Sequence, residues 1–336
     1  MMLSIEQVEP ANETSSELGL PKLMMEPPEL SLHATYFPFG FPAEVRTNSE
    51  TVLELFEGLW GRFSKQRDTE PIRCEVQLVE GHGTACPAAP IYRLMLPLMI
   101  SIADADNHCI VDLERAEAKI ALSHAALRDP AYAQYFFLGV PACCIATRYA
   151  TPVHSACVAL NGRGVLLCGD SGAGKSTLAY ACARSGWTYV SDDGTYILDG
   201  GVNRQVTGNC HQVRFRPSAA RMFPEFEGYQ ITPRAAGKPS IELPTAPMAH
   251  ITCAQSTRAD FICFLNRRSA DSPQLVPFSK DLARRSMRQV LYGTKESLEK
   301  QYEAIEKLLT AEVFELKYSS LDWAIDRLQL LVVMGQ

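Results

Sequence analysis

The residues with the clearest capacity for chemistry lie between Gly169 and Ser176, where the sequence reads Gly-Asp-Ser-Gly-Ala-Gly-Lys-Ser. This stretch matches the pattern G-x-x-x-x-G-K-[ST] at each fixed position. Glycine reaches backbone angles closed to other residues, so successive N–H groups can turn inward around phosphate oxygens. Lys175 adds a positive charge for the outer phosphates, and the Ser176 hydroxyl is suited to ligate Mg²⁺. The pattern predicts a nucleotide phosphate site formed by Gly169, Asp170, Ser171, Gly172, Ala173, Gly174, Lys175, Ser176 and Thr177.

A pair of carboxylates follows this stretch. Residues 187–191 predict a short strand that ends in Asp192 and Asp193. Adjacent carboxylates repel each other, so a divalent cation or a raised pKa on one of them would explain the pair. One carboxylate could hold Mg²⁺ while the other accepts the proton of an attacking hydroxyl. A solvated turn at Asp193-Gly194 is the alternative.

The elements next to the glycine stretch have the order that a phosphate loop requires. Residues 164–168 are apolar and predict a buried strand. Residues 175–185 place small and apolar side chains at helical spacing, and Gly186 stands where a helix would end. This helix would direct its partly positive N-terminus at the same anion.

An antiparallel hairpin is predicted to lead into the loop, because Asn161-Gly-Arg-Gly164 separates the alternating segment 153–160 from the strand that follows. Doubly wound proteins place a crossover helix between neighbouring strands, so the hairpin indicates a more antiparallel core. His154 lies on the first hairpin strand, at the end far from the turn and level with the loop. An imidazole there could orient a carboxylate or balance the changing charge on the phosphate, and a structural residue is the alternative.

Together these features resemble the bacterial HPr kinase/phosphorylases, whose C-terminal domain phosphorylates a serine of a carrier protein. That family has a histidine on a hairpin strand, a loop of Gly-Asp-Ser-Gly-x-Gly-Lys-Ser type, a helix and a strand ending in Asp-Asp. The chain matches with His154, residues 169–176 and Asp192-Asp193 in the same order. The more distant phosphoenolpyruvate carboxykinases have a similar core. The similarity covers about residues 152–193.

The resemblance implies a role for each of the matching residues. Asp192 is the expected catalytic base, Asp193 the partner of the metal or of the histidine, and His154 the orienting neighbour. Lys175 completes the catalytic set, and Ser176 and Asp193 are the expected metal ligands. The chain departs from the family at Gln212, which stands where a glutamate is usual, and at Thr177, where a glutamate often follows the loop. These departures concern the acceptor and the reverse reaction, and they leave nucleotide binding intact.

The expected fold is an α/β P-loop kinase core of HPr kinase and PEP carboxykinase type, with a mixed sheet, preceded by a smaller α+β domain. The expected activity is ATP- and Mg²⁺-dependent transfer of the γ-phosphoryl group to a hydroxyl, most simply a serine, of a protein or a small molecule. A nucleotide-binding regulatory or scaffold protein without transfer is one alternative, and an NTPase is another. The aspartate pair favours transfer, because a binding module needs no base.

Five basic residues are candidates to neutralise charge on the transferred phosphate, because the loose transition state of phosphoryl transfer spreads charge over several oxygens. They are Arg214, Arg216, Lys238, Arg267 and Arg268. Each is otherwise an ordinary surface charge. Residues 232–244 are expected to form a mobile lid over the site.

The length of 336 residues predicts two domains. We expect a disordered tail at 1–28, an accessory α+β domain at 29–150 and the P-loop kinase domain at 151–336. The accessory domain shows no clustered ionisable residues, so it is expected to pack or to oligomerise, and a homo-oligomer is one assembly that the sequence allows. Its predicted elements are a helix that starts at Asn48 or Ser49 and buries Val52, Leu53, Phe56 and Leu59, strands at 72–79, 92–102 and 109–113, and a helix at 132–145 interrupted near Pro141. Helices at 280–291, 297–309 and 321–333 are expected to close the chain.

Composition excludes several classes of protein. A net charge of −6 without long runs of lysine or arginine argues against a nucleic-acid surface. The 11 cysteines are scattered and odd in number, which predicts buried thiols instead of a disulfide framework. The sequence shows neither a secretory signal nor an apolar run of about 18 to 20 residues, so a cytoplasmic protein without membrane contact is expected.

Overall fold

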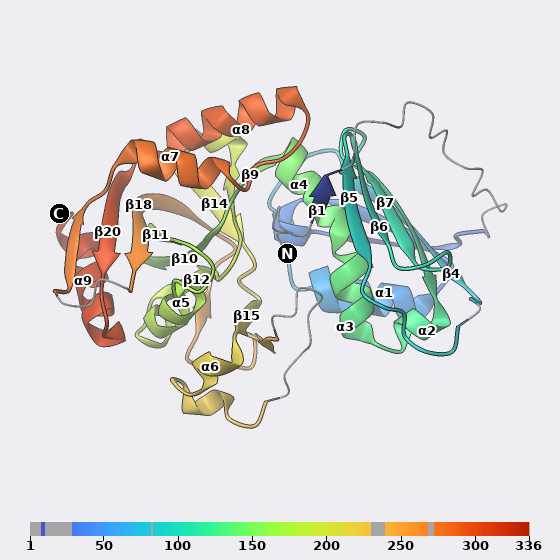
Figure 1. Ribbon diagram of the computed structural model, residues 1–336, viewed down its shortest axis with the longest axis horizontal. Helices are drawn as coiled ribbons and strands as arrows, with labels where there is room; N and C mark the ends of the chain where they lie inside the picture. Colours follow the sequence, from blue (N-terminus) through green and yellow to red (C-terminus); the bar gives the residue numbers. More distant parts are fainter. Residues whose placement is uncertain (1–7, 11–28, 82, 230–238, 268–271, 336) are drawn as a thin grey trace. The chain divides into compact units, whose positions relative to one another are not determined.

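The computed structural model describes residues 8–10, 29–81, 83–229, 239–267 and 272–335, and it shows a mixed α/β protein (Figure 1). The chain divides into two compact units between Arg148 and Tyr149. Most of the tail predicted at 1–28 lies outside the described residues. Residues 232–238 of the predicted lid, which include Lys238, and residue Arg268 also lie outside them. Within the described ranges, no helix is both long enough and apolar enough to cross a membrane.

The first unit is built on an eight-stranded sheet in the order β1-β5-β6-β7-β8-β4-β3-β2. Residues alternate between buried and exposed along β3, as expected for a sheet with one face against a core. Helix α1 (Glu50–Trp60) supplies Val52, Phe56 and Trp60 to the buried side. The strands are β1 (Val8–Pro10), β2 (Leu32–Tyr36), β3 (Ala43–Thr47), β4 (Ile72–Val79), β5 (Ile91–Met95), β6 (Leu98–Ile102), β7 (His108–Asp112) and β8 (Glu117–Ser123).

The strand predicted at 72–79 is confirmed as β4, but three other predictions in this unit were wrong in part. The strand predicted at 92–102 is the hairpin of β5 and β6, because Pro97 has no N–H to continue a ladder. Helix α1 buries Leu55 and Trp60 instead of Leu53 and Leu59, so its apolar face is rotated. The helix predicted at 132–145 consists of short turns: α3 (Pro130–Ala133), a π-helix (Gln134–Leu138), a 3-10 turn (Val140–Ala142) and α4 (Cys143–Arg148).

The second unit contains a ten-stranded mixed sheet whose main path is β17-β12-β10-β11-β18-β14-β13-β9. The long strand β18 is its centre: along one edge it pairs with β11, and along the other it pairs first with β14 and then with β20. The strands are β9 (Ala150–Val153), β10 (Ser155–Leu160), β11 (Arg163–Cys168), β12 (Thr188–Ser191), β13 (Thr195–Leu198), β14 (Gln205–Gly208), β17 (Thr252–Cys253), β18 (Ser256–Asn266), β19 (Gln274–Pro277) and β20 (Glu312–Lys317).

The hairpin that was predicted to enter the glycine loop is confirmed as β10 and β11. Its turn is Asn161-Gly162, where both residues have positive φ angles of 51° and 75°. The register places Ser155 opposite Cys168. The residue before β10 therefore lies beside the residue after β11, which is the first of the glycine loop.

The strand directions bring several segments to one edge of this sheet. Strands β11, β18 and β20 are adjacent and parallel, so their C-terminal ends lie together. Strand β12 is antiparallel to β10, which is antiparallel to β11, so β12 also ends at this edge. The glycine loop follows β11, the aspartate pair follows β12, Arg267 follows β18, and Tyr318 follows β20.

Helices cover both faces of the sheet. Helices α5 (Lys175–Arg184) and α9 (Leu321–Met334) lie on one side, and α7 (Lys280–Arg288) and α8 (Lys295–Leu308) on the other (Figure 1). Strand β11 shows the alternation directly: Val165 and Leu167 pack with the core of α5 and α9, while Leu166 and Cys168 pack with that of α7 and α8. The loop after β11 is therefore held on a strand buried from both sides.

The last three predicted helices are confirmed as α7, α8 and α9, with ends that differ from the predicted ones by at most three residues. Part of the predicted lid is a strand, since β16 (Ile241–Pro244) pairs with β15 (Gln212–Phe215) in a two-stranded ribbon. All 11 cysteines are free thiols, as predicted, and most are buried.

Candidate functional site

The glycine loop occupies the short connection between β11 and α5. Gly174 is the residue before α5 and has a φ of 99°, which disfavours any residue with a side chain. A Cβ on Gly174 would also lie 3.1 Å from Tyr318 Oη and 3.2 Å from Arg267 Cδ. Glycine is thus required here by the backbone angle and by the crowding from two neighbouring strand ends.

The variant Gly174→Ala is expected to lower the free energy of unfolding by about 1 to 3 kcal/mol, because it adds backbone strain and a close contact. Chemical denaturation measures this loss. Gly186→Ala is the matched control, since Gly186 ends the same helix with a φ of 89° but has no atoms within 4 Å of the added Cβ. Equal losses in the two variants would show that Tyr318 and Arg267 do not crowd the loop.

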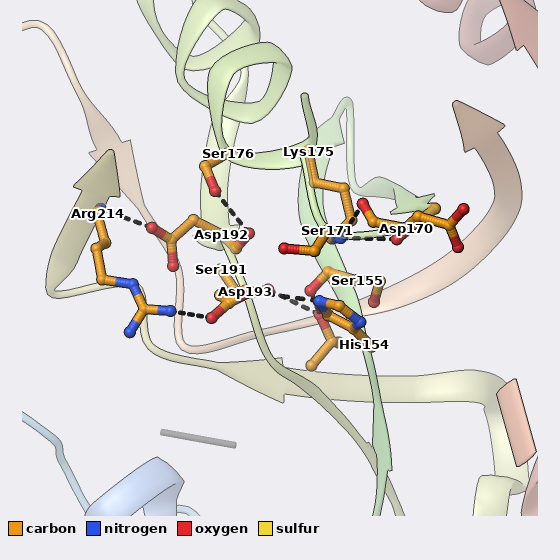
Figure 2. Close-up of polar contacts among 12 residues, drawn as sticks. His154, Ser155, Asp170, Ser171, Lys175, Ser176, Ser191, Asp192, Asp193 and Arg214 are labelled. Carbon is orange, nitrogen blue, oxygen red and sulfur yellow. Dashed lines mark hydrogen bonds and ion pairs between the residues drawn. The ribbon is translucent and has the colours of Figure 1, made fainter. Parts of the chain in front are cut away.

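Lys175 curls back over the loop. Its Nζ donates hydrogen bonds to the carbonyl oxygens of Gly169, at 2.7 Å, and Asp170, at 3.1 Å (Figure 2). Burial lowers the pKa of Lys175, while the nearby carboxylate of Asp193 acts in the opposite direction. The ammonium is therefore placed at the mouth of the loop, and it is partly compensated by a carboxylate that it does not touch directly.

Ser176 joins the loop to the aspartate pair. Its hydroxyl donates a hydrogen bond of 3.2 Å to the backbone carbonyl of Asp192. The start of α5 is thereby held against the end of β12. The residues predicted as phosphate cradle and as carboxylate pair lie in one place.

The carboxyl group of Asp192 is buried, with the residue 8 % exposed. Its Oδ2 accepts a hydrogen bond of 2.6 Å from the backbone N–H of Arg214. Burial raises the pKa of Asp192 to about 7, although the charge of Arg214 acts to lower it. At neutral pH this carboxyl group can therefore both accept and release a proton.

The surroundings of Asp193 favour its charged form, in contrast to those of Asp192. Its Oδ1 lies 3.5 Å from His154 Nε2, and its Oδ2 forms an ion pair with the guanidinium of Arg214 (Figure 2). Burial opposes ionisation, but the hydrogen bond from His154 and the charge of Arg214 prevail and lower the pKa of Asp193 well below its usual range. Two adjacent carboxyl groups are thus separated in pKa, which is the pattern of an acid/base group beside a permanently charged one.

Hydrogen bonds between strands hold the turn that carries the two aspartates. The hydroxyl groups of Ser191 and Thr195 lie 2.7 Å apart on either side of the pair. Thr195 Oγ1 also donates to the carbonyl of Ser155, at 3.0 Å. The turn is therefore fastened to β10 next to His154, and this brings the histidine to Asp193.

Strand β15 and the residue that follows it supply two arginines to the site. The hydroxyl of Tyr189 donates to the carbonyl of Gln212, at 3.2 Å, and fixes the start of β15 against β12. Arg214 then reaches Asp193, and Arg216 donates to Ser171 Oγ of the glycine loop at 2.9 Å. Alternation predicts the shared face of these two side chains, but not that one binds the carboxylate pair and the other the loop.

Most predicted site residues are brought together, with one local correction. His154 was predicted on the first hairpin strand, but it lies at the junction between β9 and β10, where the strand is interrupted. Arg214 was predicted as a candidate for the transferred phosphate, but its ion pair with Asp193 was not predicted. Tyr318 was not predicted at all, since no local pattern in the sequence marks it.

The donor set of the site suits Mg²⁺ bound together with phosphates. Among the described residues, no cluster of three or more His, Cys, Asp or Glu side chains could hold a metal ion alone. Mg²⁺ commonly takes one or two protein ligands and completes its coordination with phosphate oxygens and water. The Ser176 hydroxyl and the adjacent aspartate pair fit that pattern.

Comparisons with known proteins give matches among solved structures alone. No protein-family model matches the chain, and no curated protein matches it. One solved structure that is similar is that of the Hpr(Ser) kinase/phosphatase from Coxiella burnetii, with 12 % sequence identity and a TM-score of 0.29, covering 55 % of this chain and 95 % of that one. A similarity this weak does not establish a function, so function is argued from the residues of the site.

Proposed function

We propose that the unit beginning at Tyr149 is a P-loop kinase domain that transfers the γ-phosphoryl group of ATP, with Mg²⁺, to a hydroxyl group of the serine type. The observation that carries this proposal is the pair of adjacent aspartates whose pKa values are shifted in opposite directions. Ser176 links this pair to the glycine loop by its hydrogen bond to Asp192, and Lys175 binds the carbonyl oxygens of the same loop. A cradle without such a pair would suffice for binding alone.

The loop residues 169–177 would hold the phosphates of the nucleotide. Backbone N–H groups and the N-terminus of α5 favour the negative charge. Lys175 would exchange the carbonyl oxygens of Gly169 and Asp170 for phosphate oxygens. Bound Mg²⁺ would neutralise charge on the outer phosphates, with Ser176 and an aspartate as its protein ligands.

Asp192 would act as the base in the transfer step. The acceptor hydroxyl gives its proton to the Asp192 carboxylate while its oxygen bonds to the γ-phosphorus. The bond from that phosphorus to the β,γ-bridging oxygen breaks, and ADP leaves with the bond electrons. Asp193 stays ionised and, with His154, holds Arg214 beside the reacting groups; Arg216 faces the loop at Ser171.

The rate is expected to rise with pH and to level off above about 7, because only ionised Asp192 can accept the proton and burial raises its pKa to about 7. The positive charge of Arg214 favours the ionised form. Arg214→Ala should therefore move the acidic limb of the kcat/KM profile to higher pH, whereas Arg216→Ala should leave its position unchanged. If the acidic limb of the kcat/KM profile of Arg214→Ala lies at the same pH as that of wild type, Asp192 is not the base.

The experiment that tests the proposal follows the γ-phosphate of labelled ATP in the presence of Mg²⁺. Wild-type protein and Asp192→Asn are incubated with cell extract, with free serine and without acceptor. Label that reaches a serine-containing product only with wild type supports the kinase and begins to identify the acceptor. Release of phosphate without acceptor would favour an NTPase, and tight binding without transfer or release would favour a nucleotide-binding regulatory protein.

A further inference from the structure

The edge of the sheet that carries the glycine loop also carries a second group of residues, on the flank away from the aspartates. Arg267 follows β18 and Tyr318 follows β20, and these strands are the next two beyond β11. The aspartate pair follows β12, which lies two strands away from β11 in the other direction. The loop therefore has a different set of polar side chains on each side.

Arg267 and Tyr318 meet the loop at Gly174. A Cβ on that glycine would lie 3.2 Å from Arg267 Cδ and 3.6 Å from one of its terminal nitrogens. The guanidinium carbon is 5.9 Å from the centre of the Tyr318 ring, within the range of a cation–π contact. Arg267 itself is exposed, so its charge faces solvent beside Gly174, the residue before α5.

The hydroxyl of Tyr318 is an unusual feature of this contact. The residue is only 1 % exposed and belongs to the core between α5, α9 and the sheet. Within the described part of the chain, Oη has no hydrogen-bond partner, and it points at Gly174. Buried hydroxyl groups are normally paired, so this one is consistent with a partner that arrives with a ligand of the loop.

We infer that Arg267, positioned by Tyr318, binds the α-phosphate end of the nucleotide, the part that ATP and ADP share. This inference rests on the proposed function. If the γ-phosphate is transferred beside Asp192, the rest of the nucleotide extends across the loop toward the opposite flank, where β18 and β20 end. Arg216, which contacts Ser171, lies at a different point of the loop and is assigned to the γ-phosphate end.

The two assignments are separated by measuring the affinity of the magnesium complexes of ATP and ADP by calorimetry. Arg267→Ala is expected to weaken both by the same factor, about 10-fold or more, because a charge-assisted contact to a shared phosphate is lost. Arg216→Ala is expected to lower the affinity for ATP and to change the affinity for ADP by less than about twofold. Arg267→Lys should restore only part of the loss, since lysine lacks the planar fork. Arg285→Ala removes an exposed arginine of α7 and serves as the matched control.

Tyr318→Phe tests the positioning role. It keeps the ring under Arg267 but removes the buried hydroxyl, so we expect a loss of ADP affinity without any fall in Tm. A residue with only a structural role would change Tm and leave the affinity unchanged.

The outcomes distinguish this inference from the proposed function. Wild-type affinity for ADP in Arg267→Ala, or a loss confined to ATP, would overturn the assignment of Arg267 and leave the kinase proposal standing. Wild-type ADP affinity in Tyr318→Phe would overturn the role of the tyrosine. A wild-type protein that binds neither nucleotide would overturn the proposed function, and the inference with it.

Discussion

Asp192→Asn is expected to lower kcat by about 10²- to 10⁴-fold, the usual contribution of a positioned general base, while the affinity for ATP changes by less than about threefold. The amide has nearly the shape of the carboxyl group, and its oxygen can still accept the hydrogen bond from the N–H of Arg214. It cannot take the proton of the acceptor. Transfer of γ-labelled phosphate and calorimetric binding of ATP measure the two quantities on the same preparation.

Asp192→Asn is also expected to affect the pH dependence of stability. A carboxyl group with a raised pKa is most easily accommodated when protonated, so the contribution of Asp192 to stability is fully present at acidic pH and is lost as pH rises through about 7. Asp192→Asn should therefore be at least as stable as wild type at pH 8. A loss of kcat with a lower Tm at that pH would indicate a damaged fold instead of a missing base.

Asp260→Asn is the matched control for this variant. Asp260 is buried to a similar degree, with 7 % exposure against 8 %, and it pairs with Arg204 and Arg258. It lies in the first half of β18, away from the edge that carries the loop. Its amide variant should keep the wild-type kcat. Equal losses in both variants would mean that buried carboxyl groups in this unit matter for folding and not for catalysis.

Lys175→Met is expected to weaken ATP binding by about 10- to 100-fold, because charge-assisted hydrogen bonds to phosphate are lost from a buried position. Methionine fills a similar volume, and the lysine is already penalised by burial, so Tm should not fall. Calorimetry measures the affinity, and thermal unfolding without nucleotide measures the stability.

Lys300→Met is the control, since Lys300 is an exposed lysine of α8 paired with Glu296. It removes the same charge from the opposite side of the sheet. Unchanged ATP affinity in Lys175→Met would end the assignment of residues 169–177 as a phosphate cradle. A gain in Tm without nucleotide would agree with the burial of the ammonium.

Local patterns in the sequence were sufficient for the framework of the site. The hairpin turn at Asn161-Gly162, strand β11 and helix α5 lie where the pattern places them. Each depends on residues that are near one another in the chain: turn geometry, alternation along a strand and helical spacing. The strand predicted at 92–102 was wrong because a single proline, Pro97, interrupts the longer apolar pattern.

The residues that can do chemistry are evident from the chain alone: a glycine loop with Lys175 and Ser176, and two aspartates at a strand end. How those groups behave follows from their neighbours in the folded protein. The direction in which the pKa of Asp192 is shifted depends on burial and on Arg214, which is 22 residues away along the chain. The contact of Tyr318 with Gly174 depends on the order of parallel strands. Charge environments are sums over neighbours in space, and a local sequence pattern does not specify those neighbours.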